Sequence, residues 1–367
     1  MRASILDQSP IISGHTAADA IAATLDLAQA AEDLGYERFW LAEHHGLLSL
    51  ADPCPEILLA RIGSLTQRIR IGSGGILLPY YPPFKVAEQF RMLEALFPGR
   101  IDLGLGRAPG GDMATARAIT GSTTGGSYNA AEFFAQQVME LVALLEGSLP
   151  AEHPYAEVTL QPQVMTAPQV WILGSSEYGG ALAAHLGLRF AFAHFINPHG
   201  GQAVARAYRQ DFKPAAGAQD TRGALTPHPH QALALFCICA ATQGEADDMA
   251  MAVDVRRLQM AYGINAPIAT VEEARGRMAH LNERDRRIID QERPRAIIGT
   301  PDLVADRAAE LAQLFAADEV VILSVAPDYA ARVKSYELLA TAMAAHADVP
   351  GSQLRGIPDP AARESTG

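Results

Sequence analysis

The sequence has few cysteines, and this scarcity excludes the small folds that are held together by disulfides. Its 367 residues include three cysteines, Cys54, Cys237 and Cys239, too few for a disulfide framework. Cys237 and Cys239 lie two residues apart in an apolar run, so we expect both to face the same side of a buried strand. No second pair of Cys or His accompanies them, and the spacing therefore does not predict a zinc knuckle.

Long apolar runs and an excess of positive charge are also missing. No uninterrupted hydrophobic run approaches the length of a membrane span, and the first residues lack the apolar core of a signal peptide. With 29 Lys and Arg against 41 Asp and Glu, the formal net charge is −12, which disfavours nucleic-acid phosphate as a partner. We expect a cytoplasmic protein that binds neither membranes nor nucleic acid.

The chain alternates short apolar runs with amphipathic helical stretches, a pattern typical of βαβ units and a parallel sheet. One helix is expected from just after Thr16 to near Gly35. Eight units in a chain of this length favour a single (β/α)₈ TIM barrel over an open doubly wound sheet, because no glycine-rich fingerprint follows the first strand. The eight candidate strands are residues 4–7, 38–43, 69–74, 101–106, 170–174, 189–194, 233–240 and 319–325.

Two insertions and a tail interrupt this pattern. Residues 148–166 are rich in Pro, His and β-forming residues and predict a small hairpin insert. Residues 261–296 are crowded with charge and predict an insertion at the catalytic rim, which is either a mobile lid or a solvated surface helix. We expect one barrel domain over residues 1–347, followed by a disordered tail at 348–367.

Polar residues follow the predicted strands at the end where barrel enzymes place their active sites. Because the C-terminal ends of all eight strands meet at one rim, we expect these residues to converge there. They are Asp7 and Gln8 after the first strand, Glu43, His44 and His45 after the second, Ser73, Gly74 and Gly75 after the third, Arg107 after the fourth, Gly174, Ser175 and Ser176 after the fifth, and His194 at the end of the sixth.

The two histidines beside Glu43 have two interpretations. They form either a hydrogen-bonded corner or a proton-transfer site, and the other polar strand ends on the same rim favour the second. Glu43 could orient His44 or raise its pKa. Strand alternation places Glu43 and His44 on opposite faces, however, so His45 is better placed to meet Glu43.

Arg107 and the serines after the fifth strand indicate a phosphate clamp. A guanidinium donates a bidentate fork to phosphate, and the amides and hydroxyls at a helix N-terminus supply further donors. The alternative is a structural ion pair between Arg107 and a nearby acid.

At these residues the sequence resembles the bacterial luciferase-like monooxygenase family, and the likeness extends from the first strand to about Ala345. The resemblance implies reduced FMN on the barrel rim and O₂ as a co-substrate. It makes His44 the catalytic histidine, Gly74-Gly75 a cis peptide under the flavin ring, and Arg107 and Ser176 the phosphate contacts. The stretches that carry it are FWLAEHH (39–45), IRIGSGGILLP (69–79), PGRIDLGLGR (98–107), VWILGSS (170–176) and Gly299-Thr300-Pro301.

The sequence departs from luciferase itself at three positions. Gly106 stands where the light-emitting subunit has a reactive cysteine, Ser175 where it has a carboxylate, and His194 where it has a tryptophan. The resemblance therefore supports flavin binding, but it does not support light emission or a long-chain aldehyde substrate. A deazaflavin-dependent oxidoreductase and a non-catalytic flavin-binding protein remain alternatives.

A metal-dependent barrel hydrolase is a further alternative from a different class. It needs a His-x-His pair after the first strand, and Leu6-Asp7-Gln8 contains none. His228-Pro229-His230 has the spacing but precedes its strand, which places it on the opposite rim. No metal is therefore predicted.

The sequence thus predicts an FMN-dependent monooxygenase that uses reduced FMN and O₂ to oxidise a small, apolar organic substrate. Catalysis is assigned to Glu43, His44 and His45. A separate flavin reductase is expected, because the chain has no nicotinamide fingerprint. The resemblance implies a homodimer through the helices after the second and third strands. The apolar residues expected at that contact are Ile57, Leu58, Phe90 and Leu93.

Overall fold

The computed structural model describes residues 1–107, 112–121, 133–214 and 223–347. Two 3₁₀ turns, Leu78–Tyr80 and Arg293–Arg295, accompany its helices and strands. The tail predicted at 348–367 lies outside the described residues. The strands are β1 Arg2–Asp7, β2 Arg38–Leu41, β3 Arg70–Leu77, β4 Ile101–Gly106, β5 Gln169–Gly174, β6 Arg189–Ala193, β7 Gln231–Cys239, β8 Ala296–Gly299 and β9 Glu319–Leu323. The helices are α1 Ala17–Asp33, α2 Pro55–Leu65, α3 Pro83–Leu96, α4 Met113–Thr120, α5 Phe134–Glu146, α6 Glu177–Leu186, α7 Gly201–Gln210, α8 Gln243–Ala261, α9 Val271–Met278, α10 Glu283–Glu292, α11 Pro301–Leu314 and α12 Tyr329–Ala347.

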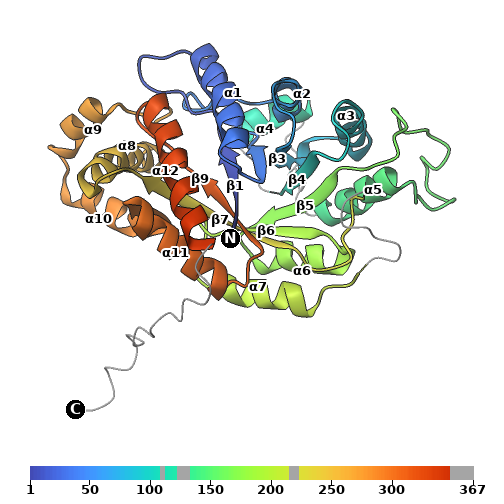
Figure 1. Ribbon diagram of the computed structural model, residues 1–367. Helices are drawn as coiled ribbons and strands as arrows, with labels where there is room; N and C mark the ends of the chain where they lie inside the picture. The colour runs from blue at the N-terminus through green and yellow to red at the C-terminus, as the bar shows by residue number, and fades with distance from the viewer. Residues whose placement is uncertain (108–111, 122–132, 215–222, 348–367) are drawn as a thin grey trace, which may run out of the picture.

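Eight of the strands close into a parallel barrel with helices outside it (Figure 1). Strands β1 to β7 are neighbours in chain order, β6 pairs with β7, and β9 lies between β7 and β1. Each of these eight strands therefore has a partner on both sides. The predicted (β/α)₈ TIM barrel is confirmed, and the closed ring excludes an open doubly wound sheet.

The ninth strand, β8, is absent from the sequence prediction. Its four residues pair with Phe236–Cys239, the C-terminal half of β7, while the first half of β7 pairs with β6 and β9. β8 therefore extends the sheet beyond the barrel at the catalytic rim. A four-residue strand directly after a charged stretch has little periodicity of its own, and its pairing with β7 is what makes it a strand.

The predicted limits of the first helix are confirmed by its capping. Thr16 is the N-cap of α1, and it forms a capping box in which its hydroxyl accepts from the amide of Asp19 while the Asp19 carboxylate accepts from the amide of Thr16. Gly35 follows the helix with a φ of +80°, a conformation that glycine adopts without steric cost.

The hairpin predicted at 148–166 is wrong, because this stretch contains turns and no strand. Its backbone carbonyls find a different partner. The guanidinium of Arg91 on α3 donates to the carbonyls of Val164 and Thr166 at 3.0 and 3.3 Å, and also to the carbonyl of Leu145. The Arg91 side chain thus satisfies backbone carbonyls that, in a hairpin, would accept hydrogen bonds from a partner strand.

The insertion predicted at the rim is present, but it begins earlier than residue 261. Helix α8 packs into a separate hydrophobic core with Ile12 and Val325, which follow β1 and β9. Beyond α8, the Asn265 side chain donates to the carbonyl of Gly46 at 2.7 Å and accepts from the amide of Leu48 at 2.6 Å. The segment from α8 to α10 is therefore fastened to the loops after β1 and β2, over the C-terminal end of the barrel. Whether it moves as a lid stays a prediction.

The interior of the barrel is filled at its N-terminal end and open at the other. Arg38 donates to both Glu319 and Asp102, with N–O distances of 2.9 Å. Burial alone would raise the pKa of Asp102, but Arg38 and Arg70 lower it to about 2. Trp40 lies above this network and donates its indole N–H to Asp102 at 3.0 Å. Small interior residues such as Ala191 and Ala234 follow toward the C-terminal end, and they leave space there.

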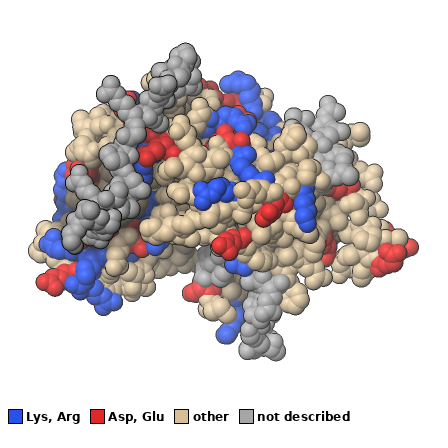
Figure 2. Space-filling model, turned by 90° about the horizontal axis from the view of Figure 1, so that it is seen from below, with Lys and Arg blue, Asp and Glu red and all other residues tan. Residues whose placement is uncertain are grey.

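The surface carries charges of both signs. Figure 2 shows Lys and Arg interspersed with Asp and Glu on one face, with blue side chains gathering toward the end where Figure 1 shows α9 and α10. Within the described residues, no helix is both long and apolar enough to cross a membrane.

Candidate functional site

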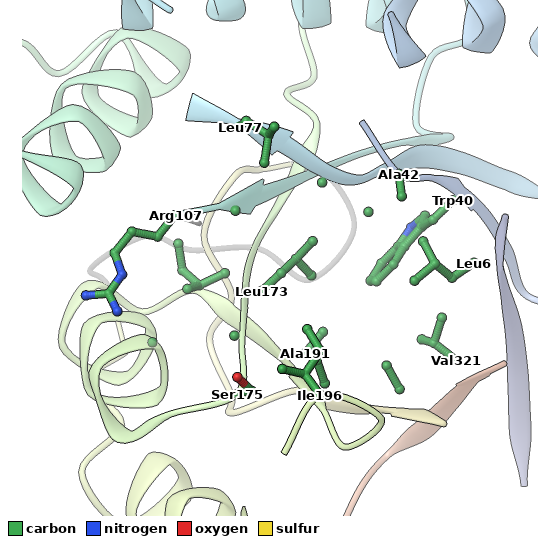
Figure 3. A pocket seen from close by; sticks show the side chains of 18 of the residues that line it. Leu6, Trp40, Ala42, Leu77, Arg107, Leu173, Ser175, Ala191, Ile196 and Val321 are labelled. Atoms are coloured by element: carbon green, nitrogen blue, oxygen red, sulfur yellow. The ribbon is translucent and has the colours of Figure 1, made fainter. Parts of the chain in front are cut away.

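A cavity of about 350 Å³ opens at the C-terminal ends of the barrel strands, where the sequence predicted a site. Its size lies in the range of about 300–1,000 Å³ that is usual for ligand pockets. Figure 3 shows Leu6, Trp40 and Val321 forming an apolar wall, with Arg107 at the opposite end beyond Leu173. The cavity can therefore enclose a molecule that is apolar over most of its length and charged at one end.

Two glycines form one wall of the cavity. The peptide between Gly74 and Gly75 is cis, as the family resemblance implied, and it lies where the register between β3 and β4 shifts. A Cβ atom on Gly74 would come within 2.6 Å of the Leu6 side chain, and one on Gly75 within 2.6 Å of the carbonyl oxygen of Gly104. The backbone of Gly104 therefore excludes a side chain at position 75, and the wall that the two glycines form is bare backbone.

His44 lines the cavity just after β2. Its Nδ1 is buried and has no hydrogen-bond partner among the described residues. Burial, and then the positive charge of Arg256, lower the pKa of His44 to about 4. The imidazole is therefore neutral at pH 7, and the suggestion that Glu43 raises its pKa is wrong.

Glu43 instead binds His45, as strand alternation predicted. Its Oε1 lies 2.6 Å from Nε2 of His45 and accepts from the hydroxyl of Tyr81 at 2.6 Å, while its Oε2 accepts from the amide of Leu77 at 2.8 Å. Burial and the hydrogen bond to Glu43 raise the pKa of Tyr81. Glu43 lines the cavity but His45 does not, so this cluster ties the loop after β2 to the end of β3.

The charged end of the cavity is formed by Arg107 and the start of α6. The exposed guanidinium of Arg107 lies 4.3 Å from the ring centre of Tyr178, a cation–π contact. Ser176 is the N-cap of α6, and its hydroxyl makes no capping hydrogen bond. Asn197 holds the preceding turn by donating to the carbonyl of Ser175 at 3.0 Å. A guanidinium, a free hydroxyl and helix N-terminal amides thus face one another, the donor set that suits a phosphate.

Two of the strand-end residues that were expected at the rim, and were candidates for cofactor binding, lie away from the cavity. Ser73 is fully buried in the barrel wall, where its hydroxyl donates to the carbonyl of Gly104 at 2.9 Å. His194 packs edge-on against Phe315, with ring centres 5.7 Å apart. Ala191 and Ala193 face the cavity, so by strand alternation His194 faces outward. The structure therefore offers no contact between these two side chains and a molecule in the cavity.

The residues that the structure brings together in the cavity wall are Glu43, His44, Gly74, Gly75, Arg107, Gly174, Ser175 and Ser176. Tyr81, Tyr178 and Arg256 were not predicted from the sequence. Tyr178 could have been found, because it lies two residues into the helix that Ser176 begins. Tyr81 and Arg256 reach the site through tertiary packing, which leaves no local signal.

No group of three or more His, Cys, Asp or Glu side chains suited to a metal ion occurs in the described part of the chain. His228 and His230 border a separate cavity with Arg38 and Arg70. That cavity lies at the N-terminal end of the barrel, opposite the candidate site, where the sequence analysis had placed these histidines.

The residues that line the cavity fit a flavin-type cofactor. Bare backbone at Gly74 and Gly75 leaves room for a flat ring system, because no side chain projects from either residue. The apolar wall suits the ring, and the donors at Arg107 and Ser176 suit a phosphate.

Comparisons with known proteins identify relatives that match nearly the whole chain. A family model described as luciferase-like monooxygenase matches residues 1–318. The chain is 41% identical over 341 residues to the protein named YwcH of Bacillus subtilis (strain 168), covering 93% of this chain and 98% of that protein. It is 34% identical over 349 residues to the N-acetyl-S-alkylcysteine monooxygenase of the same organism, covering 94% and 99%.

Solved structures show the same fold. The crystal structure of apo-MsnO8 superposes with a TM-score of 0.82 at 35% identity, covering 94% of this chain and 97% of that one. Two more distant structures share the fold alone. They are the oxygenating constituent of 3,6-diketocamphane monooxygenase from Pseudomonas putida in complex with FMN (TM-score 0.67, 19% identity, coverage 94% and 98%) and an F420-dependent secondary alcohol dehydrogenase (TM-score 0.64, 14% identity, coverage 93% and 98%).

Proposed function

The chain belongs to the luciferase-like monooxygenase family, and on that premise we propose that it uses reduced FMN and O₂ to oxidise a small organic substrate. One oxygen atom enters the substrate, the other leaves as water, and the flavin gives up the two electrons that balance the reaction. The observation that supports this proposal most strongly is the cavity itself. A glycine wall, an apolar interior and a phosphate-binding end occur together at the catalytic rim of the barrel.

Arg107 and Ser176 are proposed to hold the FMN phosphate. The guanidinium contributes a charge-assisted contact, and the free hydroxyl and N-terminal amides of α6 contribute the rest. Tyr178 keeps the Arg107 side chain over its ring. When bound in the cavity, reduced FMN would supply the electrons that activate O₂.

His44 is proposed to move a proton at the reacting centre. Its imidazole is neutral because burial and Arg256 lower its pKa, so it is ready to accept a proton. The unpartnered Nδ1 is a candidate acceptor. Glu43 and His45 act indirectly in this proposal, because their hydrogen bonds fix the loop that carries His44.

The FMN assignment has one specific competitor, a deazaflavin, since a structural neighbour is named as dependent on F420. Oxygen uptake with a panel of organic substrates decides between them. The proposal expects substrate-dependent uptake with chemically reduced FMN. Turnover with a reduced deazaflavin alone, or flavin binding without substrate oxidation under any condition, would contradict it.

The substrate is proposed to be small and mainly apolar, because Leu6, Trp40 and Val321 form the wall opposite the phosphate end. The relative named as an N-acetyl-S-alkylcysteine monooxygenase makes thioethers a sensible first class to screen. A separate flavin reductase is proposed to supply reduced FMN, since no nicotinamide fingerprint follows β1. We place the enzyme in the cytoplasm and treat residues 1–347 as one domain.

A homodimer is proposed through α2 and α3, with a correction to the residues involved. Phe90 and Leu93, which the sequence suggested as surface contacts, are core residues that are 0% and 3% exposed. Ile57, which the sequence also suggested, is exposed, and so are Met92 and Leu96; these three line a surface groove between the two helices. Exposed apolar groups that gather in this way are typical of a protein interface.

A further inference from the structure

Helix α8, in the insertion at the catalytic rim, carries a half-buried arginine, Arg256. Ala252 and Val253 on α8 pack into the core that includes Ile12, just after β1. Arg256 follows them by four and three residues, so it lies on the same face of the helix. Its charge acts on the His44 imidazole, which lines the cavity.

Arg256 differs from the arginines beside it in having no partner. Arg257 and Arg293 both pair with Asp254, at 3.5 and 3.0 Å. Within the described residues, Arg256 forms neither an ion pair nor a hydrogen bond. It is nevertheless half-buried, and burial lowers its pKa to about 10.

An unpaired cation in such a place is unfavourable unless something compensates for it. Removing a guanidinium from water costs free energy that an anionic partner restores. Glu43, the carboxylate beside His44, is already hydrogen-bonded to His45, Tyr81 and the amide of Leu77. Asp52, whose backbone carbonyl accepts from the amide of His44, is a poor anionic partner because burial raises the pKa of its carboxyl to about 7. The missing partner is therefore best supplied from outside the protein.

We propose that Arg256 binds a carboxylate on the organic substrate, so that the enzyme acts on amphipathic acids whose apolar part enters the cavity beside His44. This deepens the proposed function and rests on it for the identification of the ligand as a substrate. Arg107, at the phosphate end, and Arg256, on the insertion, would then bind two different anions. Because Arg107 binds the cofactor phosphate, the anion at Arg256 belongs to the substrate, and the substrate is therefore an acid.

Equilibrium binding to the full chain without flavin tests the site directly. The probes are hexanoate and hexanamide, which differ in charge but hardly in shape. The chain has two tryptophans: Trp40 lines the cavity and Trp171 packs against it with ring centres 5.1 Å apart. Intrinsic fluorescence therefore reports occupancy.

Hexanoate is expected to bind at least about 10-fold more tightly than hexanamide, the usual value of one charge-assisted contact. R256Q should remove this preference by weakening hexanoate alone, and R256K should retain part of it, because lysine keeps the charge without the fork. R275Q is the matched control. It removes one positive charge from the same insertion at a position where Arg275 is exposed and pairs with Asp248, and it should behave like the native chain.

Three results would overturn the proposal: equal affinity of the native chain for the two probes, a preference for hexanoate that survives in R256Q, or no hexanoate binding at millimolar concentration. Circular dichroism checks that each variant is folded. If R256Q does not fold, R256K still tests the proposal. Because these titrations contain no flavin, their result does not depend on whether the chain has monooxygenase activity. A carboxylate site in a chain that never consumes O₂ would refute the monooxygenase function alone.

Discussion

The carboxylate of Glu43 lies 2.6 Å from Nε2 of His45, and this contact fixes the loop on which His44 is presented to the cavity. The same oxygen accepts from Tyr81, and the second oxygen accepts from the amide of Leu77. Two neighbouring strand ends are thus joined at one buried group. His44 lies between these two anchored residues, and its own Nδ1 has no hydrogen-bond partner among the described residues.

Replacing Glu43 with Gln should therefore cost stability. Removing the charge weakens hydrogen bonds to a buried carboxylate, an effect of about 1.5–3 kcal/mol. Tyr81→Phe removes a single bond of the same cluster and should cost about 0.5–1.5 kcal/mol. Urea unfolding measures both. Unfolding midpoints equal to that of the native chain would show that the cluster does not hold the loop.

Asp52 should make stability fall as pH rises. Burial raises its pKa from 3.8 to about 7, so the folded state favours the protonated carboxyl. Its contribution to stability is complete below pH 4 and is lost as pH rises through 7. Asp52→Asn keeps an acceptor for the amide of Cys54 and stays neutral, so it should remove this loss.

The measurement is the melting temperature at several pH values, comparing Asp52→Asn with Asp26→Asn, which removes the same charge from an exposed position. His44 contributes the opposite slope, since its lowered pKa costs stability as pH falls from 6.5 toward 4. Each substitution is therefore compared with the native chain at the same pH. Parallel curves for Asp52→Asn and the native chain would contradict the prediction.

Arg107→Ala should weaken FMN binding by about 1.5–3 kcal/mol, or about 10- to 150-fold, because it removes a charge-assisted contact to phosphate. Tyr178→Leu should have a smaller effect, about 0.5–1 kcal/mol, since it removes only the cation–π contact with Arg107. Riboflavin lacks the phosphate and is the control ligand. If the native chain binds riboflavin as tightly as FMN, the assignment of this end of the cavity is wrong.

The proposed dimer should dissociate when the groove on α2 and α3 is made polar. Ile57→Lys and Met92→Glu place charges at positions that are 69% and 53% exposed in the single chain, so neither change disturbs the core. Sedimentation should shift from twice the 39.1 kDa chain mass to the chain mass. A native protein that sediments as a monomer at micromolar concentration would refute the dimer.

The sequence predicted the barrel and much of the cavity wall because both depend on local pattern. Strand ends at Glu43, Gly74, Arg107 and Gly174 converge in any closed parallel barrel. Features that depend on packing across the chain were missed or mistaken. Arg91 satisfies the carbonyls of 148–166 in place of a hairpin partner, and β8 exists only through its pairing with β7.

His194 and Arg256 differ in how far local sequence pattern determines their positions. His194 follows the inward-facing Ala191 and Ala193 in a strand with a two-residue period, so alternation alone already places it outside the barrel. Arg256 gives no such signal. It is one of several arginines after β7, and only the course of α8 over the rim distinguishes it from Arg257.

His44→Ala tests whether the imidazole takes part in the chemistry. A group that moves a proton in the rate-determining step contributes about 10²–10⁴-fold, so single-turnover product formation should slow by that factor while FMN affinity stays within about twofold. The pH dependence gives a second measurement. Because burial and Arg256 lower the pKa of His44 to about 4, the native rate should rise through pH 4 and then stay level toward neutrality. The variant should lose that rise. If His44 is only structural, His44→Ala should react more slowly but should keep the rise in rate near pH 4. If the variant turns over at the native rate, another group moves the proton.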